Sequence, residues 1–271
     1  SETWTWLHSP VFRATPLDIK AEADIHFLQG INQLIGHGFA YTPPQVEYPG
    51  WRFYASGAYT EKNPWWIVMP DVTRYLQRVS WLLRRGEAQN DVALYMPNAD
   101  VWSAFRAGKV HMIEQLRDHV GPLIMPRVLD AGFGLDFIDD PAIHGAHVLS
   151  GTAKYRIVVL PGVTTIPVES MRALETFKNA GGLVVAVRAV PSLAPGLNAT
   201  AAEHAKVREI ASRLFPDGAV AESNLDAALL KARQPEIQLS KAIPNIGFAH
   251  RRVADTEIFF VANTSNVRRN A

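Results

Sequence analysis

The sequence predicts an α/β fold whose central part is a doubly wound domain, with a parallel sheet covered by helices on both faces. Apolar residues make up 48% of the 271 residues and charged residues 20%, which is typical of a folded chain. Between residues 89 and 235, short strands alternate with helical stretches, and several of the strands are wholly apolar. A strand that is buried on both faces needs apolar side chains throughout, as in a parallel sheet between two helical layers.

A helix is expected to begin after Thr15. Thr15 can cap the helix, Pro16 suits its first turn, and Asp18 stands three residues after the cap. Gly30 is expected to end it. The residues that repeat at helical spacing along it are Leu17, Ala21, Ile25 and Leu28.

A buried strand and a long helix are expected next. The segment 33–41 is rich in apolar and aromatic residues and is followed by Thr42-Pro43-Pro44, so it reads as the strand. After a loop over 45–64 with aromatic residues between glycines, the helix runs from Trp65 to Arg85 and is closed by Gly86. One face of this helix is formed by Val68, Val72, Tyr75, Leu76, Val79, Leu82 and Leu83.

The central domain is expected to contain four strands, and the chain then ends in a hairpin. The strands are expected at 91–96, 135–138, 156–160 and 183–187, with helical stretches over 100–107, over 111–119 and around Met171, Leu174 and Phe177. The hairpin joins strands over 246–253 and 257–262. Because two strands alone are marginal in water, the hairpin must pack on the α/β domain or begin a further sheet.

Composition excludes several kinds of protein. The net charge of +1 and the absence of a long basic run make a nucleic-acid partner a poor expectation. No stretch approaches 18 apolar residues, so no membrane span is expected. The first residues, Ser-Glu-Thr-Trp-Thr-Trp, do not form a signal peptide and read like the middle of a longer protein.

Sequence motifs argue against an enzyme in the α/β domain itself. With no cysteine there is no thiolate nucleophile, no disulfide and no Cys-ligated zinc. No Gly-x-Ser-x-Gly elbow is present, and no Gly-x-Gly-x-x-Gly or phosphate loop follows a strand. We therefore expect a structural domain, which covers a neighbouring domain or makes the subunit contacts of a homo-oligomer.

Several strings resemble one family in their order and spacing. They are Ala23-Asp24-Ile25-His26-Phe27-Leu28-Gln29-Gly30, Gly36-His37-Gly38-Phe39-Ala40-Tyr41, Asn63-Pro64-Trp65-Trp66, Leu82-Leu83-Arg84-Arg85-Gly86 and Asp91-Val92-Ala93-Leu94-Tyr95. They resemble the end of the barrel in α-L-rhamnosidases of glycoside hydrolase family 106. The segment with Val159-Leu160-Pro161 is similar to the amidotransferase-like domain of many galactosidases, and Phe259-Phe260-Val261 resembles the first hairpin of a β-sandwich.

The resemblance implies three domains and a reaction. Residues 1–88 would be the C-terminal end of a (β/α)8 barrel, 89–235 a flavodoxin-like, amidotransferase-like domain, and 236–271 the start of a β-sandwich. The segment 33–41 would be the eighth barrel strand. The reaction would be inverting hydrolysis of a terminal deoxyhexose, with L-rhamnose favoured. The carbohydrate substrate and the upstream barrel segment would be the partners, and the location periplasmic or secreted.

The same resemblance places a catalytic carboxylate at Glu2. Glycoside hydrolysis needs two carboxylates, one as acid and one as base or nucleophile, and the second would lie upstream of Ser1. Glu2 is otherwise a solvated residue at a chain end. His37 and Tyr41, at the end of the predicted strand, are candidates for sugar binding, and His37 is otherwise a core histidine.

Three aromatic residues of the following segment are further candidates. Trp51, Tyr54 and Trp65 either stack on a sugar or pack a loop against the barrel rim. A calcium ion is implied for some relatives, but no convincing ligand set for it is found, so no metal site and no cofactor are expected.

Other polar clusters are interpreted as structural. His144 and His147 have a spacing that could suit a metal, but no third ligand accompanies them. Asp136, Asp139 and Asp140 cluster at a strand and are expected to serve turns and caps. The alternative to an enzyme is a non-catalytic carbohydrate-binding or assembly module, which would bind a sugar without turnover.

Overall fold

The computed structural model describes most of the chain. The described residues are 1–7, 10–52, 54–106, 108, 111–144, 155–238, 245–265 and 267–269. They form two compact units. One unit combines Ser1–Ala88 with Ile243–Ala271, and the other is Gln89–Ala242.

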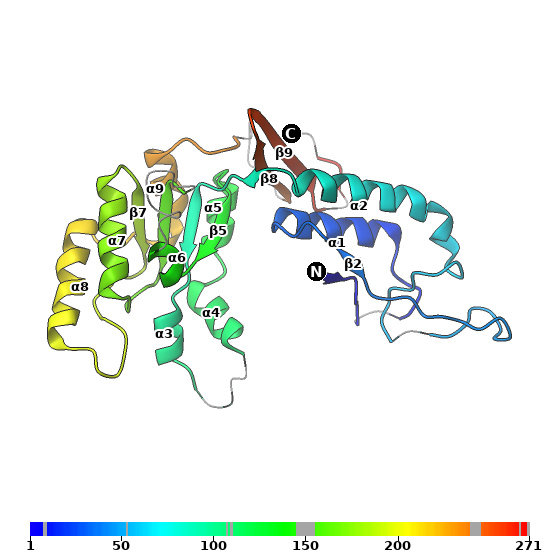
Figure 1. Cartoon of the computed structure of the whole chain (residues 1–271), viewed down its shortest axis with the longest axis horizontal. Coiled ribbons are helices and arrows are strands. Elements are labelled where there is room, and N and C mark those ends of the chain that lie inside the picture. Colours follow the sequence, from blue (N-terminus) through cyan, green and yellow to red (C-terminus); the bar gives the residue numbers. More distant parts are fainter. Residues whose placement is uncertain are drawn as a thin grey trace. The chain divides into compact units, whose positions relative to one another are not determined.

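The Gln89–Ala242 unit contains a four-stranded parallel sheet (Figure 1). Its strands are β4 (Val92–Tyr95), β5 (Leu135–Ile138), β6 (Ile157–Pro161) and β7 (Leu183–Val187). They lie in the order β5-β4-β6-β7, and every neighbouring pair is parallel. The sequence expectation of a parallel sheet at these positions is confirmed.

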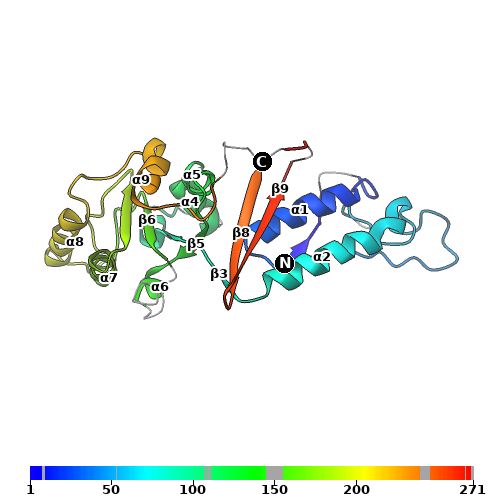
Figure 2. The same cartoon turned by 90° about the horizontal axis from the view of Figure 1, so that it is seen from above.

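Helices cover both faces of this sheet (Figure 2). Alternate residues of β4 point to opposite faces, so Ala93 and Tyr95 belong to one core and Val92 and Leu94 to the other. The first core packs α6 (Asp140–His144), α7 (Val168–Asn179) and α8 (Ala201–Leu214). The second packs α3 (Asn98–Ser103), α4 (Met112–Val120), α5 (Ile124–Asp130) and α9 (Leu225–Ala232), the last preceded by the 3-10 turn η2 (Glu222–Asn224).

The sequence reading of these helices was incomplete. The helix expected over 100–107 ends at Ser103, and α5 was not expected because it is only 7 residues long and has Pro126 inside it. α8 was not expected either, although its first residues carry a helix-capping motif that predicts a helix start. Thr200 caps it, and the Thr200 and Glu203 side chains form a capping box.

In the other unit, α1 (Pro16–Leu28) has the predicted start but a different buried face. Thr15 and Asp18 form a capping box, and Gly30 follows the helix with φ of +85°. The predicted apolar face was wrong, because Leu17 is 58% exposed and Ile25 is 40% exposed. The residues that pack into the core, four apart along the helix, are Ile19, Ala23 and Phe27.

The buried strand expected over 33–41 is also wrong in length and burial. Only β2 (Ile35–Gly36) is a strand, and both of its residues are exposed. It pairs in parallel with β1 (Glu2–Thr3), so that Glu2 lies opposite Ile35 and Thr3 opposite Gly36. Glycines at 36 and 38 weaken an extended segment, and β1 pairs with only two of its residues.

The long helix is present with a 3-10 first segment. η1 (Pro64–Val68) leads into α2 (Met69–Leu83), which runs beside α1 (Figure 1). Val79 and Leu83 are buried against α1, as expected from the apolar face. The two ends of that face are more open, since Val68 and Leu82 are each 40% exposed.

The terminal hairpin is confirmed and lies in the α1 and α2 unit. β8 (Ile246–Val253) pairs with β9 (Thr256–Asn263) and also with β3 (Glu87–Ala88), which makes a three-stranded antiparallel sheet. Phe260 of β9 meets Phe27 of α1 edge to face at 5.8 Å between ring centroids. The hairpin was expected either to pack on the α/β domain or to begin a further sheet. It forms a three-stranded sheet with β3 and packs on α1.

Candidate functional site

Glu2 and His37 are brought together by the pairing of β1 with β2. Glu2 belongs to β1, and His37 directly follows β2. The Glu2 Oε1 atom lies 3.1 Å from His37 Nδ1. Thr5 joins both, because its hydroxyl donates to Glu2 Oε1 at 3.1 Å and lies 2.9 Å from His37 Nδ1. The pair of residues proposed from the sequence thus forms one hydrogen-bonded cluster with a third residue, Thr5.

Trp4, which directly precedes Thr5 of this cluster, is buried. The Trp4 indole N–H donates to the carbonyl of Ile19 in α1 at 3.1 Å. A Cβ atom at Gly36 would lie 3.1 Å from the Trp4 ring, so a larger residue there would need this ring to shift by a few tenths of an ångström. Tyr59 packs on the same ring at 6.0 Å. Burial raises the pKa of the Tyr59 hydroxyl, and the Glu22 carboxylate adds to the effect.

The other sequence candidates lie in different surroundings. Trp65 packs with Tyr59 at 6.3 Å, and its indole N–H donates to the carbonyl of Ala14 at 2.8 Å. This hydrogen bond joins η1 to the loop before α1. Tyr41 and Trp51 are 63% and 56% exposed. The Tyr54 ring approaches the imidazole of His37 at 5.8 Å.

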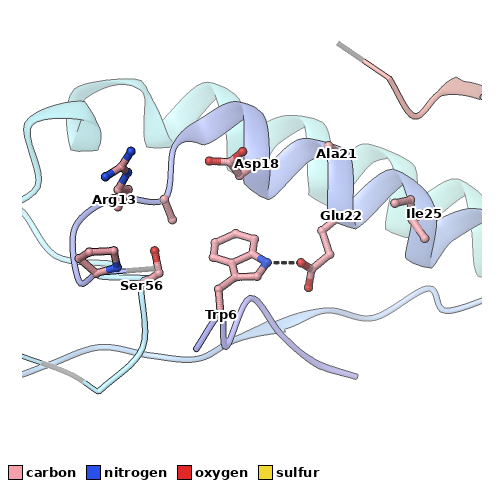
Figure 3. Close-up of a pocket in the computed structure, with 9 residues that line it drawn as sticks. Trp6, Arg13, Asp18, Ala21, Glu22, Ile25 and Ser56 are labelled. Carbon is pink, nitrogen blue, oxygen red and sulfur yellow. Dashed lines mark hydrogen bonds between the residues drawn. The ribbon is translucent and has the colours of Figure 1, made fainter. Parts of the chain in front are cut away.

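A cavity of about 650 Å³ lies along the N-terminal half of α1 (Figure 3). Glu22 reaches across it and accepts a hydrogen bond from the indole N–H of Trp6, and its other oxygen accepts the backbone N–H of Trp4 at 3.2 Å. The remaining lining residues are Pro10, Arg13, Ala14, Asp18, Ala21, Ile25 and Ser56. Neither Glu2 nor His37 lines this cavity.

The chemistry that this cluster can perform is limited by its single carboxylate. Among the residues that hydrogen-bond to one another around His37 in the described structure, Glu2 is the only acid. The two-carboxylate arrangement of a glycosidase is therefore not assembled by these residues alone. Within the described ranges, no group of three or more His, Asp or Glu side chains could hold a metal ion.

Polar clusters of the α/β unit have structural partners. The Asp139 carboxylate caps Ala142 N–H at 3.0 Å, as a capping role predicts. Asp140 accepts from the Tyr95 hydroxyl at 2.9 Å, and Asp136 accepts from the Tyr155 hydroxyl at 2.9 Å. His144 ends α6, while His147 lies outside the described residues.

The sequence of this chain matches the model of a known protein family. The model for the α-L-rhamnosidases of glycoside hydrolase family 106 matches residues 1–271, which is the entire chain. The chain belongs to this glycoside hydrolase family. The resemblance seen in the sequence motifs is thereby confirmed, and carbohydrate is the substrate class that the family implies.

Relatives of this family 106 chain are much longer than the chain itself. A "Putative beta-glucuronidase" of Formosa agariphila is 22% identical over 258 residues, which are 92% of this chain and 20% of that protein. The rhamnosidase of Novosphingobium sp. PP1Y has a TM-score of 0.62 at 19% identity, covering 93% of this chain and 24% of that chain. The second comparison shows a shared fold. The chain spans about a fifth to a quarter of the length of these relatives.

Two residues of this family 106 chain were missed by sequence reasoning. Thr5 carries no motif, and only the return of the chain at β2 reveals its contact with His37. Glu22 stands four residues from both Asp18 and His26 on α1, which looks like an ordinary exposed helix face. Its role in holding Trp4 and Trp6 depends on the loop before α1, which periodicity cannot place.

In the part of the chain that the structure describes, no helix has the length and apolarity needed to cross a membrane.

Proposed function

We propose that this chain forms the C-terminal part of an α-L-rhamnosidase, in which Glu2 is one of the two catalytic carboxylates. The observation that carries the proposal is the cluster of Glu2, Thr5 and His37 at two neighbouring parallel strands. In a (β/α)8 barrel, catalytic side chains stand at the C-terminal ends of such strands. In this proposal β1 and β2 are the seventh and eighth strands, and α1 and α2 are the helices that follow them.

Glu2 suits the role of general base. Its side chain is 67% exposed, the hydrogen bond from Thr5 ends at Oε1, and His37 Nδ1 lies 3.1 Å from the same oxygen. Oε2 can therefore accept a proton from a water molecule. The water oxygen attacks the anomeric carbon, the glycosidic bond breaks, and a carboxylic acid from the upstream barrel segment protonates the leaving oxygen. L-Rhamnose is the proposed sugar because the family is that of α-L-rhamnosidases.

Hydrolysis of an aryl α-L-rhamnoside by a protein that joins this chain to the upstream barrel segment tests this function. Glu2→Gln removes the base and keeps the shape of the side chain, so we expect turnover to fall by roughly 10²–10⁴-fold. Glu47→Gln is the matched control, because Glu47 is an exposed glutamate in the aromatic loop of the same unit. Unchanged turnover in Glu2→Gln, or faster cleavage of an aryl β-D-galactoside, would contradict the proposal.

A non-catalytic carbohydrate-binding module is the second candidate. It is favoured by the single carboxylate that the described residues place in the cluster. Titration calorimetry with L-rhamnose separates the two functions. Binding without turnover of the aryl rhamnoside, in a protein that includes the upstream barrel segment, favours the module, whereas turnover that depends on Glu2 favours the enzyme.

A further inference from the structure

We propose that Thr5 is the positioning residue of this cluster, and that its hydroxyl fixes both the Glu2 carboxylate and the proton of His37. The catalytic meaning of this inference rests on the proposed function. The hydrogen bonds themselves do not, and they can be measured on the protein without any substrate. The Thr5 hydroxyl would set both the orientation of the Glu2 carboxylate and the tautomer of His37.

The protons of the cluster can be assigned one by one. An ionised carboxylate only accepts, so the contact of 3.1 Å between Thr5 Oγ1 and Glu2 Oε1 uses the single hydroxyl proton of Thr5. Thr5 Oγ1 has no second proton to offer His37 Nδ1, which lies 2.9 Å away. The imidazole must therefore donate, and its proton is on Nδ1. Glu2 Oε1, at 3.1 Å from the same nitrogen, favours the same assignment.

This assignment determines what each group offers to a ligand. In a neutral imidazole with its proton on Nδ1, the Nε2 atom is an acceptor. On the carboxylate, Oε1 receives the hydrogen bond of Thr5, while Oε2 has no partner among the described residues. The base would therefore act through Oε2, at an orientation fixed by Thr5.

Thr5 itself is held on both sides. The preceding Trp4 is 6% exposed and donates its indole N–H to Ile19, and its backbone N–H donates to Glu22. The following Trp6 donates its indole N–H to the same Glu22 carboxylate (Figure 3). Its carbonyl also accepts the backbone N–H of Ser56 at 2.8 Å. With the backbone anchored, the branched Cβ of Thr5 restricts its side-chain rotamer and aims the hydroxyl.

Nitrogen NMR of the imidazole tests the assignment directly. The chain contains 9 histidines, so His37→Asn identifies the His37 signals in a long-range nitrogen–proton spectrum. Recorded at a pH where histidine is neutral, the wild-type spectrum should show a protonated Nδ1 and an unprotonated Nε2. Free neutral histidine favours the opposite tautomer, so an Nε2–H form of His37 in the wild-type protein would overturn the inference.

Substitutions at Thr5 separate positioning from packing. Thr5→Val keeps the branched shape without the hydroxyl, and the Nδ1–H population should fall; Thr5→Ser keeps the hydroxyl and should preserve it. Thr73→Val is the matched control, because the Thr73 hydroxyl donates to the Met69 carbonyl in α2 at 2.9 Å and should leave the His37 signals unchanged. A Thr5→Val protein that is folded by circular dichroism but keeps the wild-type tautomer would overturn the inference.

Activity gives a second readout that distinguishes this inference from the proposed function. Thr5→Val should lower kcat for the aryl rhamnoside by about 10-fold with little change in KM, and Thr5→Ser should restore most of it. If the tautomer is as assigned and the protein that includes the upstream barrel segment shows no turnover, the positioning role stands and the proposed function fails. If turnover depends on Glu2 and kcat is equal in Thr5→Val and the wild type, the proposed function stands and the positioning role fails.

Discussion

Two tyrosine hydroxyls in the α1 and α2 unit have opposite surroundings. The Tyr59 hydroxyl is buried and has no hydrogen-bond partner among the described residues. The Tyr75 hydroxyl donates to the Asp24 carboxylate, which is 1% exposed and also paired with Lys20 at 2.5 Å. Removing an unsatisfied group relieves a desolvation cost, whereas removing a donor from a buried carboxylate creates one.

We therefore expect the same substitution to have opposite effects at these two positions. Tyr59→Phe should raise the free energy of unfolding by up to about 1 kcal/mol, and Tyr75→Phe should lower it by about 1–3 kcal/mol. Each protein serves as the control for the other in urea denaturation followed by circular dichroism. A loss of stability in Tyr59→Phe would show that its hydroxyl has a partner in solution.

At the same scale, the sequence predicted residues whose partners are close in the chain. Thr15 and Asp18 are three residues apart, and their capping box follows from local geometry alone. Thr5 and His37 are separated by 32 positions, and their contact depends on the parallel pairing of β1 with β2. Glu2 was proposed through the family resemblance and His37 from its place at the end of the predicted strand, and neither argument predicted the contact between them.

At the scale of elements, α7 and α8 are joined by an ion-pair network. Arg213 of α8 donates to both oxygens of Glu175 in α7, at 2.6 and 3.2 Å, and to Glu209 at 2.8 Å. The hydrogen bond from Arg213 lowers the pKa of Glu175 below its ordinary value of 4.5. Hydrogen bonds from Lys206 and Arg213 lower the pKa of Glu209 in the same direction.

A depressed pKa stabilises the fold only while the carboxylate is charged. The contribution of this network is therefore fully present above the ordinary pKa of 4.5 and is lost as the pH falls through the lowered values. We expect Arg213→Gln to have a lower Tm than the wild type at neutral pH, and the gap to close on acidification below 4.5.

Arg172→Gln is the matched control for this prediction. It removes the same charge from α7, but the Arg172 guanidinium is exposed and makes no ion pair within the described structure. Differential scanning calorimetry across the pH range gives both comparisons. An Arg213→Gln gap that stays constant from neutral to acid pH would show that the network contributes through packing and not through charge.

Elements were predictable where the hydrophobic pattern was local and strong. The four strands of the α/β unit are apolar or nearly so and were found at the right places. The segment 33–41 has a similar composition, yet only Ile35–Gly36 is a strand, because strand formation depends on the neighbour that it pairs with. On α1, both faces carry apolar residues, so the spacing alone could not choose between Leu17 and Ile19.

At the scale of the molecule, the sequence predicted a domain change near residue 89 and another after residue 235. The structure divides at the first of these positions and at residue 243. Between residues 235 and 243, Glu236 and Ile237 hydrogen-bond to the segments that precede β4 and β5, and these contacts are called the clasp here. One oxygen of Glu236 accepts the backbone N–H groups of Asp91 and Gly134, each at 2.9 Å, and Ile237 N–H donates to the Gly132 carbonyl at 3.2 Å.

These contacts give a direct test of where the α/β domain ends. A fragment 89–242 retains the clasp, whereas a fragment 89–235 leaves the N–H groups that precede β4 and β5 without their acceptor. We expect the shorter fragment to be less stable in urea by about 1–3 kcal/mol. Within fragment 89–242, Glu236→Ala should reproduce most of that loss, while Gln238→Ala, an exposed neighbour, should not. Equal stability of the two fragments would place the end of the domain at residue 235 and reduce the clasp to a surface contact.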